Sequence, residues 1–224
     1  MAASFLPEMR MSAKRLTAVL ALAAGCCSLD AAAFYYGIGA GQATDKEWDD
    51  RVIQDGSVDA IELEDSDTGF RLFAGFPLSQ GLGFEIGYVN FGEQTAQGSA
   101  DGSGDYWTGG PATVESKLDG FDFGLVGNMP VSDALSLIAR VGVLSWENEL
   151  TYEDPAFLDK YAETGNDLFF GGGAEFHPGG PLALRGEFVR YRMDDVDVDL
   201  VSASVVYRFD GYGRRHGHRR RGRR

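Results

Sequence analysis

Eight charged side chains interrupt segments that are otherwise apolar or rich in glycine. Each has apolar or glycine neighbours, as Arg71 has Phe70 and Leu72, so in a strand it would lie on the opposite face from them. Carboxylates there could serve acid–base catalysis, but only with access for a substrate. In a closed interior they would pair with guanidinium groups, because isolated buried charges are costly. We predict a structural charge network and no catalytic residue, the network being Arg71, Glu85, Asp122, Arg140, Glu175, Arg185, Glu187 and Arg208.

The elements that must position these charges are short alternating segments. In the last one, Val201, Ala203, Val205, Tyr207 and Phe209 share one face, and the other face carries small or charged residues. Eight such segments joined alternately by tight and long connections are typical of a small transmembrane β-barrel with apolar groups outward. We therefore predict an all-β, eight-stranded antiparallel up-and-down barrel with strands over 34–42, 68–76, 82–91, 117–128, 135–146, 167–176, 182–192 and 199–209.

The connections divide into two kinds. Short turns containing Pro77, Pro130 and Pro178 predict a periplasmic rim, and 43–67, 92–116 and 147–166 predict long outer loops. The first loop is rich in carboxylates, which leaves weak divalent-cation binding open, although it lacks the spacing of a calcium loop. Trp146 falls on the inner side by parity, which would require a bulge to turn it outward.

The ends of the chain carry different signals. Lys14 and Arg15, an apolar run and Ala31-x-Ala33 predict a secretory signal peptide over 1–33, with Met11 as an alternative start. The barrel then covers 34–209. Both cysteines lie in the signal, so the mature chain would have no disulfide or cysteine metal site, although Cys26 leaves a lipoprotein cleavage open. Residues 210–224 hold seven arginines and predict a disordered tail, either without function or bound to an anionic periplasmic partner.

Charge excludes one class of partner. Residues 34–209 hold ten Lys and Arg against 31 Asp and Glu, an excess of 21 negative charges. Nucleic-acid binding requires a basic face, so we expect no nucleic acid as partner.

The histidines exclude a class of enzyme. Small outer-membrane acyl-transfer barrels use a histidine to activate a serine or water. Here His177 lies in a predicted periplasmic turn, and His216 and His218 lie in the tail, so none is on the outer half of a strand. We expect no outer-leaflet lipid-modifying enzyme or histidine-dependent barrel protease, and no metal or cofactor.

Several segments together resemble the OmpA-like outer-membrane β-barrel family. They are 120–127, 139–146, 185–192 and 198–209, and the resemblance covers essentially all of 34–209. It implies a salt-bridged interior and a closing Tyr-x-Phe signal read by the barrel-assembly machinery, carried here by Tyr207 and Phe209. Members normally end at that phenylalanine, whereas fifteen residues follow it here.

These observations predict a monomeric, non-enzymatic barrel of the Gram-negative outer membrane. Its lumen would be plugged by salt bridges, and its role would be structural or one of surface interaction. Its surroundings would be outer-membrane lipid and lipopolysaccharide. A narrow porin-like channel for ions or small solutes is the alternative.

Overall fold

The computed structural model describes residues 34–46, 57–193 and 196–209, and the side chains of 59–61 and 196 are not described. The predicted signal peptide and arginine-rich tail therefore lie outside the described residues. No described segment is a helix long and apolar enough to cross a membrane. The strands are β1 (Phe34–Asp45), β2 (Val58–Glu64), β3 (Ser66–Ser79), β4 (Leu82–Ala100), β5 (Gly110–Pro130), β6 (Leu135–Glu153), β7 (Leu158–Phe176), β8 (Leu182–Met193) and β9 (Val196–Phe209).

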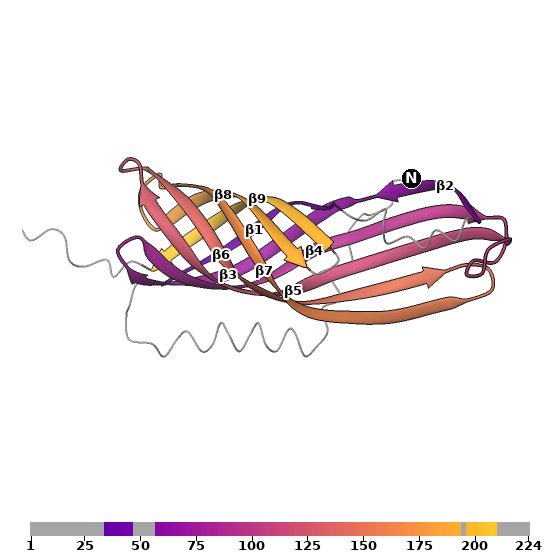
Figure 1. Ribbon diagram of the computed structural model, residues 1–224. Helices are drawn as coiled ribbons and strands as arrows, with labels where there is room; N and C mark the ends of the chain where they lie inside the picture. The colour runs from indigo at the N-terminus through magenta and orange to yellow at the C-terminus, as the bar shows by residue number, and fades with distance from the viewer. Residues whose placement is uncertain (1–33, 47–56, 194–195, 210–224) are drawn as a thin grey trace, which may run out of the picture. The chain divides into compact units, whose positions relative to one another are not determined.

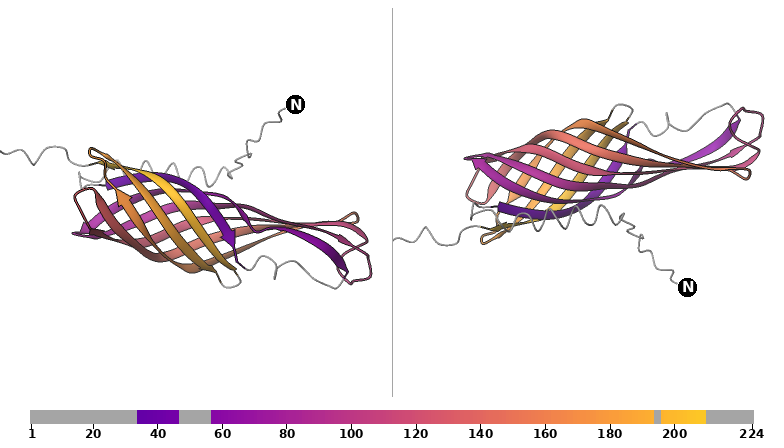
Figure 2. Two further views of the ribbon diagram at one scale, coloured as in Figure 1. Left: turned by 90° about the horizontal axis from the view of Figure 1, so that it is seen from above. Right: turned by 90° about the horizontal axis from the view of Figure 1, so that it is seen from below.

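Eight of the nine strands close a ring (Figures 1 and 2). Neighbours along the chain pair antiparallel from β3 to β9, and β1 pairs with both β3 and β9. Phe34 lies opposite Phe209, so the first and last strands meet over their full length. The predicted eight-stranded up-and-down barrel is confirmed, and β2 is a ninth strand that pairs only with the outer part of β4.

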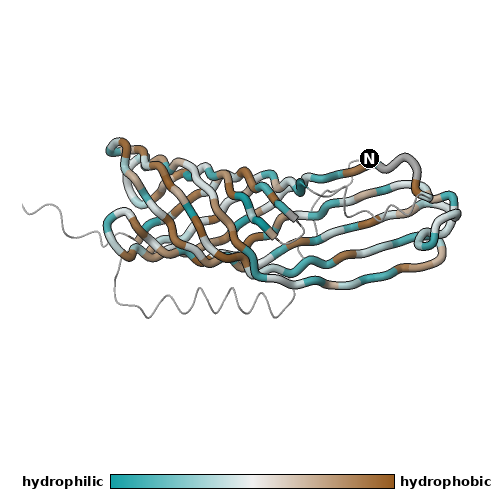
Figure 3. Tube along the Cα trace, in the orientation of Figure 1, coloured by the Kyte–Doolittle hydropathy of each residue, from teal (hydrophilic) through white to brown (hydrophobic). Residues whose placement is uncertain are grey.

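The outer face of the ring is apolar, as strands surrounded by lipid require. Ile38 is 61% exposed and Leu184 54%, although both are large hydrocarbon side chains. Brown, hydrophobic positions alternate along the ring strands in Figure 3, whereas teal and white positions dominate where β4 to β7 run past the ring. Lipid would cover the apolar side chains of the ring, and they need no protein partner.

Three tight turns connect strands at one rim. They join β3 to β4, β5 to β6 and β7 to β8. Gly81 in the first turn and Gly179 and Gly180 in the third have φ of +80°, +106° and +80°, which L side chains rarely adopt. The short turns predicted at Pro77, Pro130 and Pro178 thus lie together at the rim that the barrel architecture assigns to the periplasm.

The prediction of long outer loops is wrong over most of their length. β4 continues to Ala100, β5 starts at Gly110, β6 runs to Glu153 and β7 starts at Leu158. With β2, these extensions form an outer sheet, defined here as β2 with 93–100, 110–119, 147–153 and 158–167. The long hairpins continue the barrel as paired strands, so they do not leave it as loops (Figure 1).

The bulge considered for Trp146 is absent. β6 keeps continuous register with both neighbours from one end to the other, with Trp146 opposite Gly120 and Gly165. The indole lies on the inner side and donates from Nε1 to Asp167 Oδ2 at 2.7 Å. Because Gly165 has no Cβ, the space beside it is taken by the indole ring.

Candidate functional site

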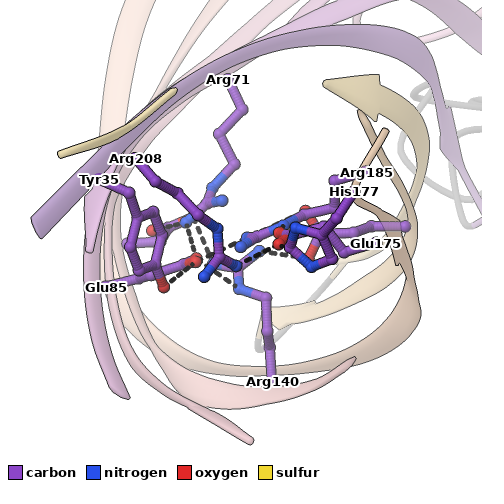
Figure 4. A network of polar contacts seen from close by, with 10 residues as sticks. Tyr35, Arg71, Glu85, Arg140, Glu175, His177, Arg185 and Arg208 are labelled. Carbon is purple, nitrogen blue, oxygen red and sulfur yellow. Dashed lines mark hydrogen bonds and ion pairs between the residues drawn. The ribbon is translucent and has the colours of Figure 1, made fainter. Parts of the chain in front are cut away.

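Seven strands of the ring each contribute a charge to the lumen, and β1 contributes Tyr35. The eight predicted network residues lie close together. Figure 4 shows Arg71, Glu85, Arg140, Glu175, Arg185 and Arg208 pointing into the lumen. Alternation places them there, since each occupies the face opposite its apolar neighbours. The network contains four arginines and four carboxylates, so its formal charge is balanced.

Glu85 is the centre of this network. Its Oε2 lies 3.1 Å from Arg140 Nε and 3.2 Å from Arg71 Nη2, and its Oε1 lies 2.6 Å from Arg185 Nη1. Tyr35 donates its hydroxyl to the same Oε1 at 2.8 Å. The Glu85 carboxylate is fully buried and has four donors around it. Such a group is satisfied and has no lone pair directed at a substrate.

The remaining pairs extend from this centre toward both sides of the lumen. Asp122 accepts from Arg71 Nε at 2.6 Å and lies 3.3 Å from Arg140 Nη2. Arg185 Nε donates to Glu175 Oε2 at 2.7 Å, and Arg208 and Glu175 form a further ion pair. The weakest link is Glu187, whose Oε1 lies 3.6 Å from Arg140 Nη1. These charge-assisted pairs link the seven strands from β3 to β9 across the interior of the ring.

Aromatic groups complete the network and were not predicted as members. Tyr191 donates to Asp122 at 3.4 Å, and the guanidinium carbons of Arg71 and Arg140 lie 4.4 Å and 5.0 Å from the ring centroids of Phe73 and Phe169. Inward parity was the available signal, because these aromatic residues alternate with outward-facing ones.

His177 lies at the periplasmic rim, where the sequence places it. Its Nε2 is 3.2 Å from Glu175 Oε1. The side chain therefore borders the network from the end opposite to the outer leaflet. His216 and His218 lie outside the described residues.

A second, apolar layer fills the lumen nearer the outer rim. Its members are fully or almost fully buried and come from seven strands of the ring, so they meet across its interior. Phe91 and Tyr191 lie edge to face with centroids 4.8 Å apart, and Phe169 contacts Tyr191 at 5.4 Å. The layer consists of Ala43, Val89, Phe91, Leu118, Leu144, Phe169, Val189, Tyr191, Met193, Val198 and Leu200.

The outer sheet has two chemically different faces. One face continues the lumen wall and carries a second buried apolar cluster that includes Val114, Leu150 and Tyr152. The other continues the lipid face and is acidic, although Lys117 Nζ there lies 2.9 Å from Glu93 Oε2. The acidic face bears Glu62, Glu64, Glu93, Glu115, Glu147, Glu149 and Glu153.

Asp154 ties the tips of the two long hairpins together. Its Oδ2 accepts from the amide and hydroxyl of Thr108, both at 2.8 Å, and its Oδ1 accepts from the amides of Ala156 and Phe157 at 2.7 and 2.9 Å. Desolvation acts to raise the pKa of Asp154, but these hydrogen bonds outweigh it and hold the pKa at about 2. The carboxylate fixes the β4–β5 connection against the β6–β7 connection.

Tyr207 and Phe209 lie on the outward face of β9 at the periplasmic end. Their rings are 4.9 Å apart, Phe209 stacks on Phe34 at 4.2 Å, and Tyr207 stacks on Tyr36 at 5.4 Å. Aromatic side chains at this level match the girdle of an outer-membrane barrel.

Among the described residues, no group of three His, Cys, Asp or Glu is placed to hold a metal ion. Residues 47–56 of the acidic segment for which cation binding was considered, 43–67, lie outside them.

Comparison with known proteins identifies the architecture. The model of the outer membrane protein beta-barrel domain family matches residues 16–209. Ail, the attachment invasion locus protein of Yersinia pestis, solved with the heparin analogue sucrose octasulfate, is 16% identical over 79% of this chain and 98% of its own, with a TM-score of 0.51. Neisserial surface protein A is 14% identical over 79% of this chain and 99% of its own, with a TM-score of 0.50. A search of curated protein sequences gave no match.

The family match covers most of the chain, and the two solved structures share its fold. The apolar ring of Figure 3 is the part that lipid surrounds. The chain lies in the outer membrane of a Gram-negative bacterium and belongs to the outer membrane protein beta-barrel domain family.

Proposed function

We propose that this chain is a non-enzymatic barrel that engages a partner at the cell surface through its outer sheet, with its lumen plugged. One observation carries the proposal. β7 pairs with β8 only between Leu168 and Phe176, so among the described residues its outer part, 158–167, has a neighbour on one side only. Unpaired backbone groups of an edge strand are a template on which another strand can add.

Two layers of side chains inside the ring favour a plugged lumen and argue against an open channel. The charge network and the apolar layer lie at different levels of the same ring, and both consist of buried side chains apart from Arg208, which is partly exposed. An eight-stranded barrel is only wide enough for side chains to fill it. An ion crossing it would have to displace both layers.

The positions of the acids and bases support a non-enzymatic role. The lumen carboxylates are bound to arginines, and His177 contacts Glu175 at the periplasmic rim. Substrates in the outer leaflet would lie at the other end of the barrel. General acid–base chemistry needs a group within reach of the reacting atoms.

The partners follow from the surfaces. Lipid contacts the apolar ring, and we assign lipopolysaccharide to the outer leaflet around it. Tyr207 and Phe209 would present the closing signal to the barrel-assembly machinery, and the self-repelling acidic outer sheet favours a monomer. An anionic periplasmic partner for the tail, 210–224, rests on its arginines alone. The heparin analogue found with Ail is a polyanion, which the acidic outer sheet here would repel.

The test combines crosslinking with conductance. A photo-crosslinking residue at Ala162, exposed on the β7 edge, should give a discrete protein adduct on intact cells, whereas one at Ala139 on the lipid face should not. Purified barrel in a planar bilayer should show no conductance steps. Steps together with no adduct at Ala162 would establish the channel and overturn the proposal.

A further inference from the structure

The outer part of β7 carries a row of three side chains that alternate in chemistry. Asp159, Tyr161 and Glu163 lie opposite Tyr152, Leu150 and Asn148, so all three are on the face that continues the lumen wall. All three are exposed, and Tyr161 is 42% exposed despite its large ring. Residues two apart along a strand are separated by roughly 6.5 Å. The row therefore places a carboxylate on each side of an aromatic ring.

The ring of Tyr161 is held in place by its neighbours. It stacks on Tyr152 with an interplanar angle of 7° and a centroid distance of 5.6 Å, and its hydroxyl donates to the Tyr152 hydroxyl at 3.2 Å. Tyr152 in turn packs against Tyr106 and Trp107 at 5.9 Å and 6.1 Å. Because the Tyr161 ring is already held against a buried aromatic residue, its side chain loses little conformational entropy when a ligand binds over it.

The electrostatics of this face favour a cation. Among the described residues of the outer sheet the basic side chains are Lys117 and Lys160, and register places both on the opposite face. Burial raises the pKa of Tyr106, and the nearby Asp159 carboxylate raises it further, which reports a negative local potential. The π face of a tyrosine also attracts cations.

We infer that the row Asp159, Tyr161 and Glu163 binds arginine or lysine side chains of a basic, extended protein segment. The inference rests on the proposed surface-interaction role and adds the chemistry of the partner. A segment running along the β7 edge also projects alternate side chains to one face, so one basic residue can lie over Tyr161 with its charge between the two carboxylates.

The test is fluorescence anisotropy with full-length barrel in detergent and a labelled peptide of alternating arginine and serine. Tyr161→Leu keeps the apolar bulk but removes the ring, and it should weaken binding about two- to fivefold. Tyr161→Phe keeps the ring and should bind like the wild type, although it loses the hydroxyl contact with Tyr152. Asp159→Asn should weaken binding more at low than at high salt.

Glu149→Gln is the matched control, because it removes one exposed negative charge from the opposite face. If Glu149→Gln and Asp159→Asn weaken peptide binding equally, the binding is due to general charge attraction and the inference is overturned. Unchanged binding of the peptide by Tyr161→Leu would overturn it as well. So would a wild-type barrel that shows no binding of the peptide but binds phosphatidylcholine vesicles. The crosslink at Ala162 is independent of these results, so the surface-interaction role can stand when the basic partner fails.

Discussion

Glu85 shows how much of the barrel depends on one carboxylate. It lies among Arg71, Arg140 and Arg185 and accepts from Tyr35, and its side chain is fully buried. Glu85→Gln leaves three buried guanidinium groups facing a neutral amide. Removing one partner of a buried ion pair costs about 3–5 kcal/mol, so the free energy of unfolding should fall by roughly that amount.

Urea unfolding in lipid vesicles, followed by the shift between folded and unfolded bands on a gel, measures this change. Glu115→Gln is the control, since the Glu115 side chain is 38% exposed and its Oε2 lies 3.9 Å from Nζ of the exposed Lys117. Its effect should stay within about 0.5 kcal/mol. Equal stability of the two variants would mean that the network contributes specificity and not stability.

Asp154 gives the outer hairpins a dependence on pH. Its folded pKa of about 2 is below the ordinary value of 3.8, so the carboxylate stabilises the tip fully above about pH 4. This stabilisation is lost as the pH falls through the folded pKa. Exchange protection of the Thr108, Ala156 and Phe157 amides, corrected for intrinsic rates, should therefore decrease from about pH 4 to pH 2. Asp154→Asn should lower that protection above about pH 4, and its difference from the wild type should shrink toward pH 2. A wild type whose protection does not depend on pH would contradict the assignment.

At the scale of elements, β4 is the strand that connects ring and outer sheet. It pairs with β3 up to Asn90 and with β2 from Thr95, and a bulge lies between Asn90 and Glu93. Gly92 in the bulge has φ +83°, and a Cβ there would meet the Asp67 carboxyl group. Asp67 Oδ2 also accepts from the Glu93 amide at 2.9 Å. The bulge lies where β4 changes partner from β3 to β2, and it leaves Phe91 and Gly92 without partner residues in the register with β5.

Gly92→Ala should loosen this connection, because an L side chain in the left-handed region costs roughly 1–2 kcal/mol and the Asp67 carboxyl group blocks its Cβ. We expect faster amide exchange in 95–100 with unchanged protection in 82–90. Gly186→Ala is the control, since nothing lies within 4 Å of a Cβ built there. Equal loss of protection in both halves of β4 would show that ring and sheet open as one unit.

The same strands explain why the outer sheet was not predicted. Along β6 the outward residues are mostly apolar up to Val143, but beyond Trp146 they are polar or acidic, and the apolar residues there, Leu150 and Tyr152, lie on the inner parity. Lipid faces the ring and water faces the sheet, so the side that must be apolar changes at the membrane boundary. Outward apolar residues therefore stop where the membrane stops, and the polar parts of the same strands beyond it resemble loops in the sequence.

For the whole molecule, the eight strands of the ring and the inward charges could be predicted from alternation and from the tight turns, whereas β2 was missed because its segment was assigned to a loop. Each of the eight charged residues lies between two apolar or glycine neighbours, as Asp122 lies between Phe121 and Phe123. The tip could not be predicted, because Asp154 reaches Thr108 across 46 residues and no local pattern encodes that contact. Tyr161 was likewise assigned to a loop, because the contact of its ring with Tyr152 depends on the pairing of β7 with β6.

The two layers of the lumen should close it independently. Glu85→Ala with Arg140→Ala removes the centre of the charge network, and Leu144→Ala with Phe91→Ala opens the apolar layer. Either pair alone leaves the other layer across the lumen, so a planar bilayer should stay silent with both double variants. The quadruple variant should give discrete conductance steps. Band shifts on heating must show that each variant is folded, because large-to-small changes of apolar core residues cost about 2–5 kcal/mol each. Conductance by either double variant would mean that the two layers do not close the lumen independently. The layer altered in that variant would then be needed to block the passage of ions.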